Sequence, residues 1–248
     1  MMLFILVTIL LLSVGFVKTH GYKLMRLMNW VNSRFITDNQ EFHEIDYEWR
    51  PRLRENYRQI RQEYAEYCNN YTVARFGDLD HIQKDYDKGK EKWLVIILKE
   101  FGTYTKNIDY FPDTFNLVKD IPGCIMVMFS AIEPNKCILP HNGPYNGVLR
   151  YHLALFTDPF DPDNCYIIVG KYKYVWRAGE DMIFDDMFLH FAQNNTQTTR
   201  VVLILDILRD FDNVFISFLN RAFVRISDYN QTKREIINRV NSIIEVKK

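Results

Sequence analysis

The spacing of hydrophobic positions divides the chain into a helical part, a β-rich part and a second helical part. After Pro51, apolar side chains recur every three or four residues, which predicts an amphipathic helix that begins on a proline. These positions are Leu53, Tyr57, Ile60, Tyr64 and Cys68. From Ile121 the pattern changes to short apolar runs separated by Pro, Gly, Asn and Asp, and from Asn213 the helical spacing returns. The pattern therefore predicts a mainly β fold with flanking helices.

Six short runs in the β-rich part are predicted strands. They are Cys124–Ile132, Val148–Phe156, Cys165–Val169, Tyr172–Trp176, Asp181–Phe184 and Val201–Leu208. Short strands with regular turn signals between them are typical of an antiparallel sandwich or jelly roll. The apolar stretch at residues 92–101 fits a helix or a strand. We expect the β core at about residues 121–209 and a C-terminal helical tail at residues 213–246.

Residues 1–17 carry no charged side chain and are largely apolar. This length suits a short membrane-spanning helix and also the hydrophobic part of a signal sequence. We expect an uncleaved N-terminal hydrophobic anchor helix here, a polar juxtamembrane connector at residues 18–50 and one domain at residues 51–248. Because Lys18, Lys23 and Arg26 follow the apolar segment, the domain is expected on the cytosolic side of the membrane.

A lumenal location is the alternative, because three triplets match the acceptor pattern for N-glycosylation. They begin at Asn70, Asn194 and Asn230.

The four cysteines are too few and scattered for a disulfide framework, and they form no CxxC pair. A disulfide between Cys137 and Cys165 stays open if the domain lies in an oxidising compartment. The 31 basic and 31 acidic residues balance, so no nucleic-acid partner is expected. The oligomeric state is not indicated.

Two histidines and one arginine are candidates for chemistry. If residues 148–156 form a strand, Arg150 and His152 share one face while the other face is apolar throughout. Taken alone, His152 fits an ordinary core histidine, and His190, which lies ten residues before Arg200, fits a loop residue. Two imidazoles that face one interior suit iron(II), and a guanidinium binds a carboxylate through two parallel hydrogen bonds.

Three separated blocks resemble, in the same order, the aspartyl/asparaginyl β-hydroxylase family, including its lipid A acyl-chain hydroxylase relatives. They are IPGCIMVMFSAIEPN at 121–135, PHNGPYNGVLRYHLAL at 140–155 and GEDMIFDDMFLHFAQNNTQTTRVVLILDI at 179–207. The similarity runs from about Pro51 to Arg209. Because this family belongs to the Fe(II)/2-oxoglutarate dioxygenase superfamily, the resemblance implies a double-stranded β-helix, which is a cupin-like jelly roll.

The resemblance also implies the cofactors and their ligands. His152 and His190 match the two histidines that bind Fe(II), and Arg200 matches the arginine that binds the distal carboxylate of the cosubstrate 2-oxoglutarate. With O2, the family decarboxylates 2-oxoglutarate to succinate and hydroxylates an unactivated carbon. The expected substrate is an Asp or Asn side chain of a protein, or the acyl chain of a membrane lipid. No catalytic residue beyond the metal and cosubstrate ligands is expected.

Ala154 departs from the wider superfamily, in which a carboxylate two residues after the first histidine is the third metal ligand. The aspartyl hydroxylase branch also lacks this carboxylate. We therefore expect a two-histidine site that 2-oxoglutarate and water complete. A rival interpretation has Asp185 or Asp186 as the third ligand.

The contact for the 1-carboxylate of 2-oxoglutarate is not fixed by the sequence. The related hydroxylases use a basic side chain on the strand after the first histidine, where this chain has Tyr166 and Ile168. Arg150 is the alternative, and its competing role is an ion pair with Asp186 or Asp206.

His141 and Asn142 lie in the loop before the first histidine and are expected to line the substrate side, although HNGPYNG is equally a turn sequence. Two other function classes stay open. A catalytically inactive jelly-roll binding module is favoured by Ala154 and by the missing 1-carboxylate contact. A cupin-like zinc or manganese protein would need further ligands.

Overall fold

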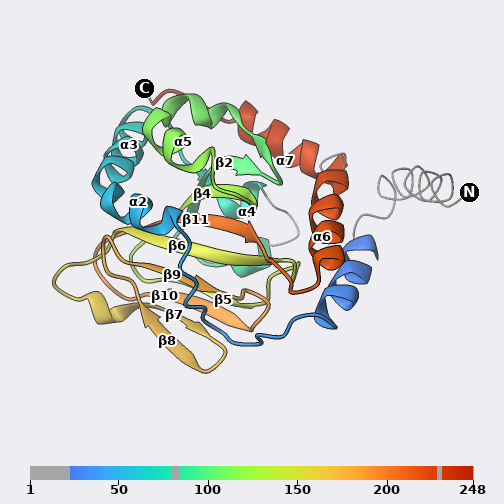
Figure 1. The fold of residues 1–248 in the computed structure, drawn as a ribbon. Coiled ribbons are helices and arrows are strands. Elements are labelled where there is room, and N and C mark those ends of the chain that lie inside the picture. The colour runs from blue at the N-terminus through green and yellow to red at the C-terminus, as the bar shows by residue number, and fades with distance from the viewer. Residues whose placement is uncertain (1–22, 80–83, 228–230, 248) are drawn as a thin grey trace, which may run out of the picture.

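The computed structural model describes residues 23–79, 84–227 and 231–247, and it contains two packed β-sheets with helices around them (Figure 1). The larger sheet has seven strands in the order β1-β2-β4-β11-β6-β9, with β3 paired to β2, and the smaller has four in the order β5-β10-β7-β8. All of these pairs are antiparallel. The prediction of a mainly β fold with flanking helices is confirmed.

The strands are β1 (Ala74–Arg75), β2 (Trp93–Glu100), β3 (Thr103–Tyr104), β4 (Cys124–Ile132), β5 (Lys136–His141), β6 (Val148–Phe156), β7 (Cys165–Val169), β8 (Tyr172–Val175), β9 (Asp181–Phe184), β10 (His190–Asn194) and β11 (Arg200–Leu208). After a helix at residues 23–33, the helices are α2 (Trp49–Glu55), α3 (Tyr57–Asn70), α4 (Phe76–Leu79), α5 (Pro112–Val118), α6 (Val214–Ser227) and α7 (Gln231–Ser242). Short 3-10 turns are η1 (Lys84–Tyr86), η2 (Lys106–Tyr110) and η3 (Pro162–Asn164).

Strand β6 shows the predicted alternation between two different environments. Its Leu149, Tyr151 and Leu153 point to the outer face of the larger sheet and pack with apolar residues of α2 and α3. The amphipathic pattern after Pro51 thus covers this face, although as two helices that are separated at Asn56 rather than one. The opposite face of β6 looks into the space between the sheets.

That space is lined by inward-facing side chains of both sheets. Ala154, Met182 and Phe184 come from the larger sheet, and Ile167 and Ala192 come from the smaller one. Burial in β10 alternates, with its first, third and fifth residues buried and the two between them partly exposed. Because the face that is buried includes a histidine and an asparagine, polar groups enter the core at this strand.

Residues 23–50, which we expected to belong to a connector, pack on the domain. The helix at 23–33 lies beside α6 and shares a small core with it through Met28, Phe223 and Val224. Further along, the backbone amide of His43 donates to the carbonyl of Ile183 in β9 at 3.0 Å. The anchor expected at residues 1–17 lies outside the described residues, and among those described no helix is both long and apolar enough to cross a bilayer.

The glycosylation triplet at Asn194 is part of the fold. The Asn194 side chain is fully buried, and its amide donates to the carbonyls of Ile132, Glu133 and Thr198 at 3.0, 3.1 and 2.8 Å. A glycan could not be attached there without removing these bonds, so this triplet does not favour a lumenal location. The triplet at Asn230 lies outside the described residues.

Candidate functional site

His152 lies in the middle of β6 and faces the space between the sheets. Its side chain is buried, and neither ring nitrogen has a hydrogen-bond partner in the part of the chain that the structure describes. The ring lies edge-on to Phe184 with centroids 5.1 Å apart, and its centroid is 6.1 Å from that of Trp176. Burial lowers the pKa of His152 well below its ordinary value, and Arg200 and Arg150 lower it further, so the ring is neutral. A buried neutral imidazole without a partner is suited to binding a metal ion.

His190 opens β10 in the opposite sheet and contacts the same Phe184 ring, at a centroid distance of 5.6 Å. Its Nδ1 lies 2.9 Å from the carbonyl oxygen of Phe188. Because a carbonyl only accepts, we assign the proton to Nδ1, which leaves a lone pair on Nε2. Metal-binding histidines are commonly oriented in this way. Burial, followed by the effect of His141, lowers the pKa of His190 to about 3.

Arg200, the first residue of β11, is buried without a carboxylate partner among the ion pairs of the described residues. Its Nη1 donates to the Ser130 carbonyl at 3.3 Å, its guanidinium carbon lies 4.3 Å from the Trp176 ring centroid, and its Nε has no partner. Burial lowers the pKa of Arg200 to about 10. The neighbouring Cys165 is a free thiol, as is Cys137, so the pairing left open for these cysteines is not formed.

Arg150 is committed to two carboxylates. Its Nε and Nη2 donate to Asp206 at 2.7 and 2.8 Å, and its Nη1 lies 3.1 Å from an oxygen of Asp186. The structure therefore places Arg150 in the ion pair that was its competing role, and binding of a cosubstrate carboxylate would have to displace one of these partners. Asp185 pairs with Arg209, so both aspartates considered as rival metal ligands already face an arginine.

Asp186 contacts the loop between β5 and β6. The Gly143 amide donates to the Asp186 carbonyl at 2.6 Å, and a Cβ at position 143 would meet the Asp186 carboxyl group at 2.2 Å. Only glycine allows this approach. Asn142 donates to the Met187 carbonyl at 2.7 Å, so its amide nitrogen serves the turn. Burial raises the pKa of Asp186 against the opposing effect of Arg150.

His141 pairs with His190 across β5 and β10, and the two ring centroids are 4.2 Å apart. Its Nδ1 lies 2.8 Å from the Leu139 carbonyl oxygen, so Nε2 again carries the lone pair. The His141 ring also stacks on Tyr86 of η1, with the two ring centroids 4.8 Å apart. The structure thus brings His141 to the histidine site, between His190 and a tyrosine from a distant segment.

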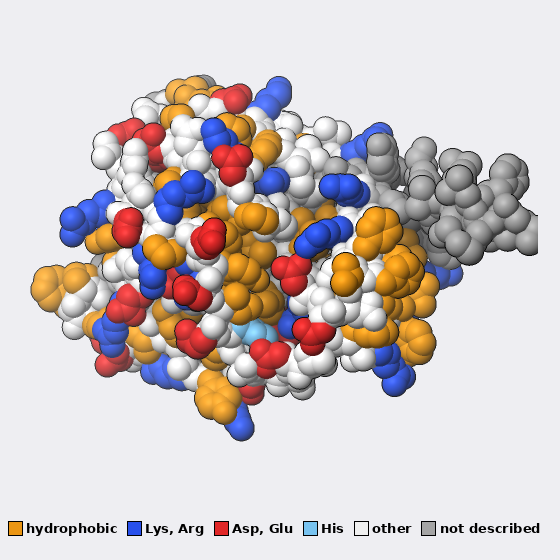
Figure 2. Space-filling model, in the orientation of Figure 1, with side chains coloured by type: hydrophobic (Ala, Val, Ile, Leu, Met, Phe, Trp, Pro, Cys, Tyr) orange, Lys and Arg blue, Asp and Glu red, His pale blue; other side chains and the backbone are white. Residues whose placement is uncertain are grey.

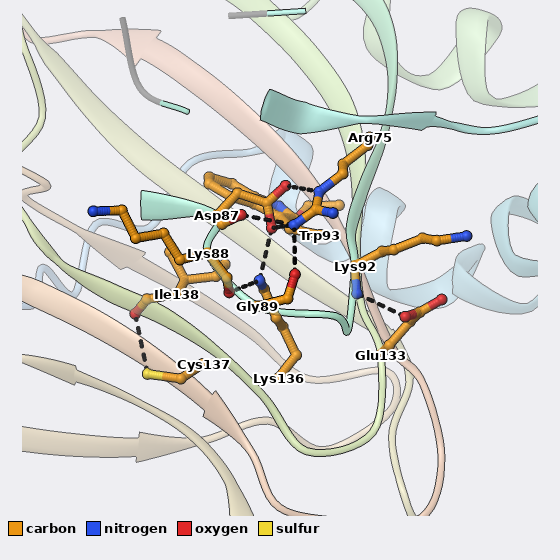
Figure 3. A network of polar contacts seen from close by, with 11 residues as sticks. Arg75, Asp87, Lys88, Gly89, Lys92, Trp93, Glu133, Lys136, Cys137 and Ile138 are labelled. Atoms are coloured by element: carbon orange, nitrogen blue, oxygen red, sulfur yellow. Dashed lines mark hydrogen bonds and ion pairs between the residues drawn. The ribbon is translucent and has the colours of Figure 1, made fainter. Parts of the chain in front are cut away.

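A buried ion cluster holds the segment that carries Tyr86 (Figure 3). Asp87 contacts Arg75 Nε and Lys136 Nζ, each at 2.7 Å, and the same Nζ donates to the Lys88 carbonyl at 2.7 Å. The side chains of Asp87 and Lys136 are 0% and 1% exposed. Because Lys136 begins β5, the cluster joins the segment around η1 to the strand that ends at His141.

Asp87→Ala should destabilise the protein more than Lys136→Met. Without Asp87, the Lys136 ammonium is left buried and unpaired, which costs about 3–5 kcal/mol. In Lys136→Met the Asp87 carboxylate keeps Arg75, so the loss should be smaller. Urea unfolding of both variants measures the difference, and equal losses would show that Asp87 does not neutralise Lys136.

The metal-free protein should lose stability below pH 6.5. A histidine whose pKa falls from 6.5 to about 3 on folding is neutral in the folded state, while the unfolded chain takes up the proton. Its contribution is complete above pH 6.5 and is lost as the pH falls towards 3, at up to about 1.4 kcal/mol per pH unit. Urea unfolding between pH 7.5 and 5 should therefore show a shallower dependence in His190→Asn. An unchanged dependence would contradict the burial of a neutral His190.

Trp176 and Tyr86 were not singled out as site residues from the sequence. Trp176 lies just after β8, and its ring contacts both Arg200 and His152, while its own Nε1 has no partner among the residues described. Neither aromatic residue is part of a recognisable motif, so only the fold reveals that they adjoin the site.

Within the described residues no group of three or more His, Cys, Asp or Glu is placed to hold a metal ion.

The chain matches the family described as Aspartyl/Asparaginyl beta-hydroxylase over residues 54–210. It is 37% identical over 145 residues to an ornithine lipid ester-linked acyl 2-hydroxylase of Rhizobium tropici, covering 58% of this chain and 51% of that protein. It is 31% identical over 124 residues to human aspartyl/asparaginyl beta-hydroxylase, covering 48% of this chain and 16% of that protein. The chain thus spans about half the length of the first relative and less of the second.

Among solved structures, a predicted oxalate decarboxylase from Thermotoga maritima aligns with a TM-score of 0.36 and 12% identity, covering 56% of this chain and 94% of that one.

Proposed function

Since the chain belongs to the aspartyl/asparaginyl beta-hydroxylase family, we propose that it is an Fe(II)- and 2-oxoglutarate-dependent dioxygenase with its site between the two sheets. The observation that carries this proposal is the buried Arg200 guanidinium, which has no carboxylate partner among the described residues and contacts the same Trp176 ring as His152. A buried charge and a buried imidazole without partners are each costly. A ligand that brings both a carboxylate and a metal ion would satisfy them together.

His152 and His190 would hold the metal. Both are neutral, both contact Phe184, and each has a free lone pair, which is what iron(II) needs from imidazole. When bound, iron with 2-oxoglutarate and O2 supplies the oxidant that hydroxylates an unactivated carbon. The protein's own contribution is to orient the rings, through the Phe188 carbonyl in the case of His190, and to surround them with apolar side chains.

Arg200 would bind the distal carboxylate of 2-oxoglutarate. The carbon of its guanidinium lies 4.3 Å from the Trp176 ring centroid, and its Nε has no hydrogen-bond partner among the described residues, so hydrogen-bonding capacity is available in a buried position. Because Ala154 supplies no third metal ligand, iron should be retained better once the cosubstrate is bound, by mass action. Arg150 is not part of this proposal, since Asp206 and Asp186 occupy it.

The substrate is proposed to be either a lipid acyl chain or an Asp or Asn side chain of a protein. The relative from Rhizobium tropici favours the lipid, and the human relative favours the protein. We further propose that residues 1–17 anchor the chain in a membrane with the domain on the cytosolic side. Incubation with iron(II), 2-oxoglutarate and O2, with either membrane lipid or peptide, should add the mass of one oxygen atom in one pool only, together with stoichiometric succinate.

The competing function is a catalytically inactive binding module, which Ala154 favours. This module would bind iron and 2-oxoglutarate weakly or not at all and would form no succinate with any substrate. Succinate above the level of an oxygen-free control excludes it. The absence of succinate with both lipid and peptide pools would contradict the dioxygenase proposal.

A further inference from the structure

The helix at residues 23–33 and α6 together present an exposed apolar face. Six of the thirteen large hydrophobic side chains that are exposed in the described residues come from residues 23–35 and from α6. They are Leu27, Trp30, Phe35, Val214, Phe215 and Phe218, between 37% and 82% exposed, and we call them the docking face. Figure 2 shows orange side chains gathered over these two helices. An apolar cluster of this kind is unusual on a monomeric soluble domain.

The charge around the docking face is mainly positive, although Asp210 and Asp212 lie just before α6 and Asp210 pairs with Arg221 at 2.8 Å. Residues 23–35 and 214–225 contain five basic residues and no acidic residue. They are Lys23, Arg26, Arg34, Arg221 and Arg225. All five are exposed, and the guanidinium of Arg34 lies 5.3 Å from the Trp30 ring centroid. Exposed Trp and Phe side chains with surrounding Arg and Lys are suited to the interface of an anionic bilayer, where rings enter the headgroup region and cations meet lipid phosphates.

The sequence before the helix restricts where this face can lie. Residues 1–17 are uncharged, and only residues 18–22 separate them from the helix at 23–33. Five residues span at most about 18 Å. If residues 1–17 enter a bilayer, the helix that follows must therefore stay close to its surface.

The docking face is also joined to the loop that leads into the candidate site. Asn29 donates to the Pro144 carbonyl at 2.9 Å and accepts from the Asn146 amide at 3.0 Å, and Asn32 donates to Asn146 Oδ1 at 3.1 Å. From the other helix, Asn220 donates to the Gly147 carbonyl at 2.8 Å. Both helices thus hold residues 144–147, three positions after His141.

We propose that the docking face lies on the surface of an anionic lipid bilayer and so brings the loop at residues 141–147 to the membrane. The role of this loop as the entrance to an active site rests on the proposed function. Membrane docking itself is independent of turnover. It would let a lipid reach the site directly from the bilayer.

Tryptophan fluorescence of the full chain in vesicles tests this. Trp30 is 59% exposed, whereas Trp49, Trp93 and Trp176 are 8%, 6% and 1% exposed, so a quencher in the lipid should reach Trp30 alone. In vesicles of phosphatidylcholine and phosphatidylglycerol with brominated acyl chains, we expect loss of the Trp30 component of the emission. The Trp30→Phe variant should show no such loss, and Phe215→Ser should reduce it because an apolar contact is removed.

The matched control places a tryptophan on another exposed aromatic position. Phe160 is 95% exposed in the loop after β6, on the other side of the molecule from α6 (Figure 1). The Phe160→Trp, Trp30→Phe double variant should float with the same vesicles and show no quenching. Quenching of Trp30 to the same degree in purely zwitterionic vesicles would overturn the anionic assignment. If neither acrylamide nor brominated lipid quenches the Trp30 emission, protein rather than lipid covers the docking face and the proposal is wrong. Succinate formation in the same samples reports separately on the proposed function.

Discussion

His152→Ala should abolish iron(II) binding and lower succinate formation by more than about 100-fold, the upper end of what the loss of a group that only orients a metal ligand costs. The reason is that in the proposed site His152 supplies one of two protein ligands, with no carboxylate at Ala154 to compensate. Within residues 23–79, 84–227 and 231–247 the side chain makes no hydrogen bond, so its removal leaves no described group without a partner. The variant should therefore remain folded by circular dichroism, while iron content and succinate are measured.

His43→Ala is the matched control, because His43 is also a buried histidine but lies outside the site. Its Nδ1 pairs with Asp38 at 3.2 Å rather than facing the space between the sheets. This variant should keep iron binding. If His152→Ala binds iron as well as the unaltered protein, His152 is a core histidine and the metal assignment fails.

Arg200→Met should weaken 2-oxoglutarate binding by about 30- to 4,000-fold, since loss of one partner of a buried charge pair costs about 2–5 kcal/mol and each 1.4 kcal/mol is tenfold. The free energy of unfolding of the ligand-free protein should stay unchanged or rise, because the variant removes a buried charge that no carboxylate neutralises. Isothermal titration gives the binding constant, and urea unfolding gives the stability.

Arg200→Lys separates charge from geometry. Lysine keeps the positive charge but lacks the planar fork, so binding should be intermediate between the unaltered protein and Arg200→Met. If Arg200→Met binds 2-oxoglutarate normally, or if it is strongly destabilised, the arginine has a structural role instead.

The strands that were predicted best are those whose burial follows a simple apolar pattern. Strand β6 has the predicted ends, and β4, β7 and β9 do as well. Strands β2 and β4 are both buried on both faces, and such strands have no alternation to distinguish them from a buried helix. Strand β4 was still predicted because it lies among the short apolar runs and turn residues that begin at Ile121, whereas the stretch at 92–101 lies before them. Strands β5 and β10 were not predicted. In β10 the inward positions include His190 and Asn194, so polar groups of the site and of a loop anchor interrupt the apolar signal.

Only those residues of the candidate site that lie within the family-like sequence blocks could be predicted. The sequence singled out His152, His190 and Arg200, and the structure brings them to the two rings of Phe184 and Trp176. For Arg150, an ion pair with Asp186 or Asp206 had been predicted as the alternative to binding the cosubstrate, and the structure shows both pairs. The aromatic neighbours could not be anticipated, because contacts between segments far apart in the sequence depend on how the two sheets pack.

The most direct test of a shared metal and cosubstrate site is an anaerobic titration of the protein with iron(II) and 2-oxoglutarate, followed by visible absorption. We expect a weak charge-transfer band that needs both additions, that is absent in His152→Ala and His190→Ala, and that requires a far higher 2-oxoglutarate concentration in Arg200→Met. A protein that gives no band, or one whose band survives the loss of either histidine, would contradict the assignment.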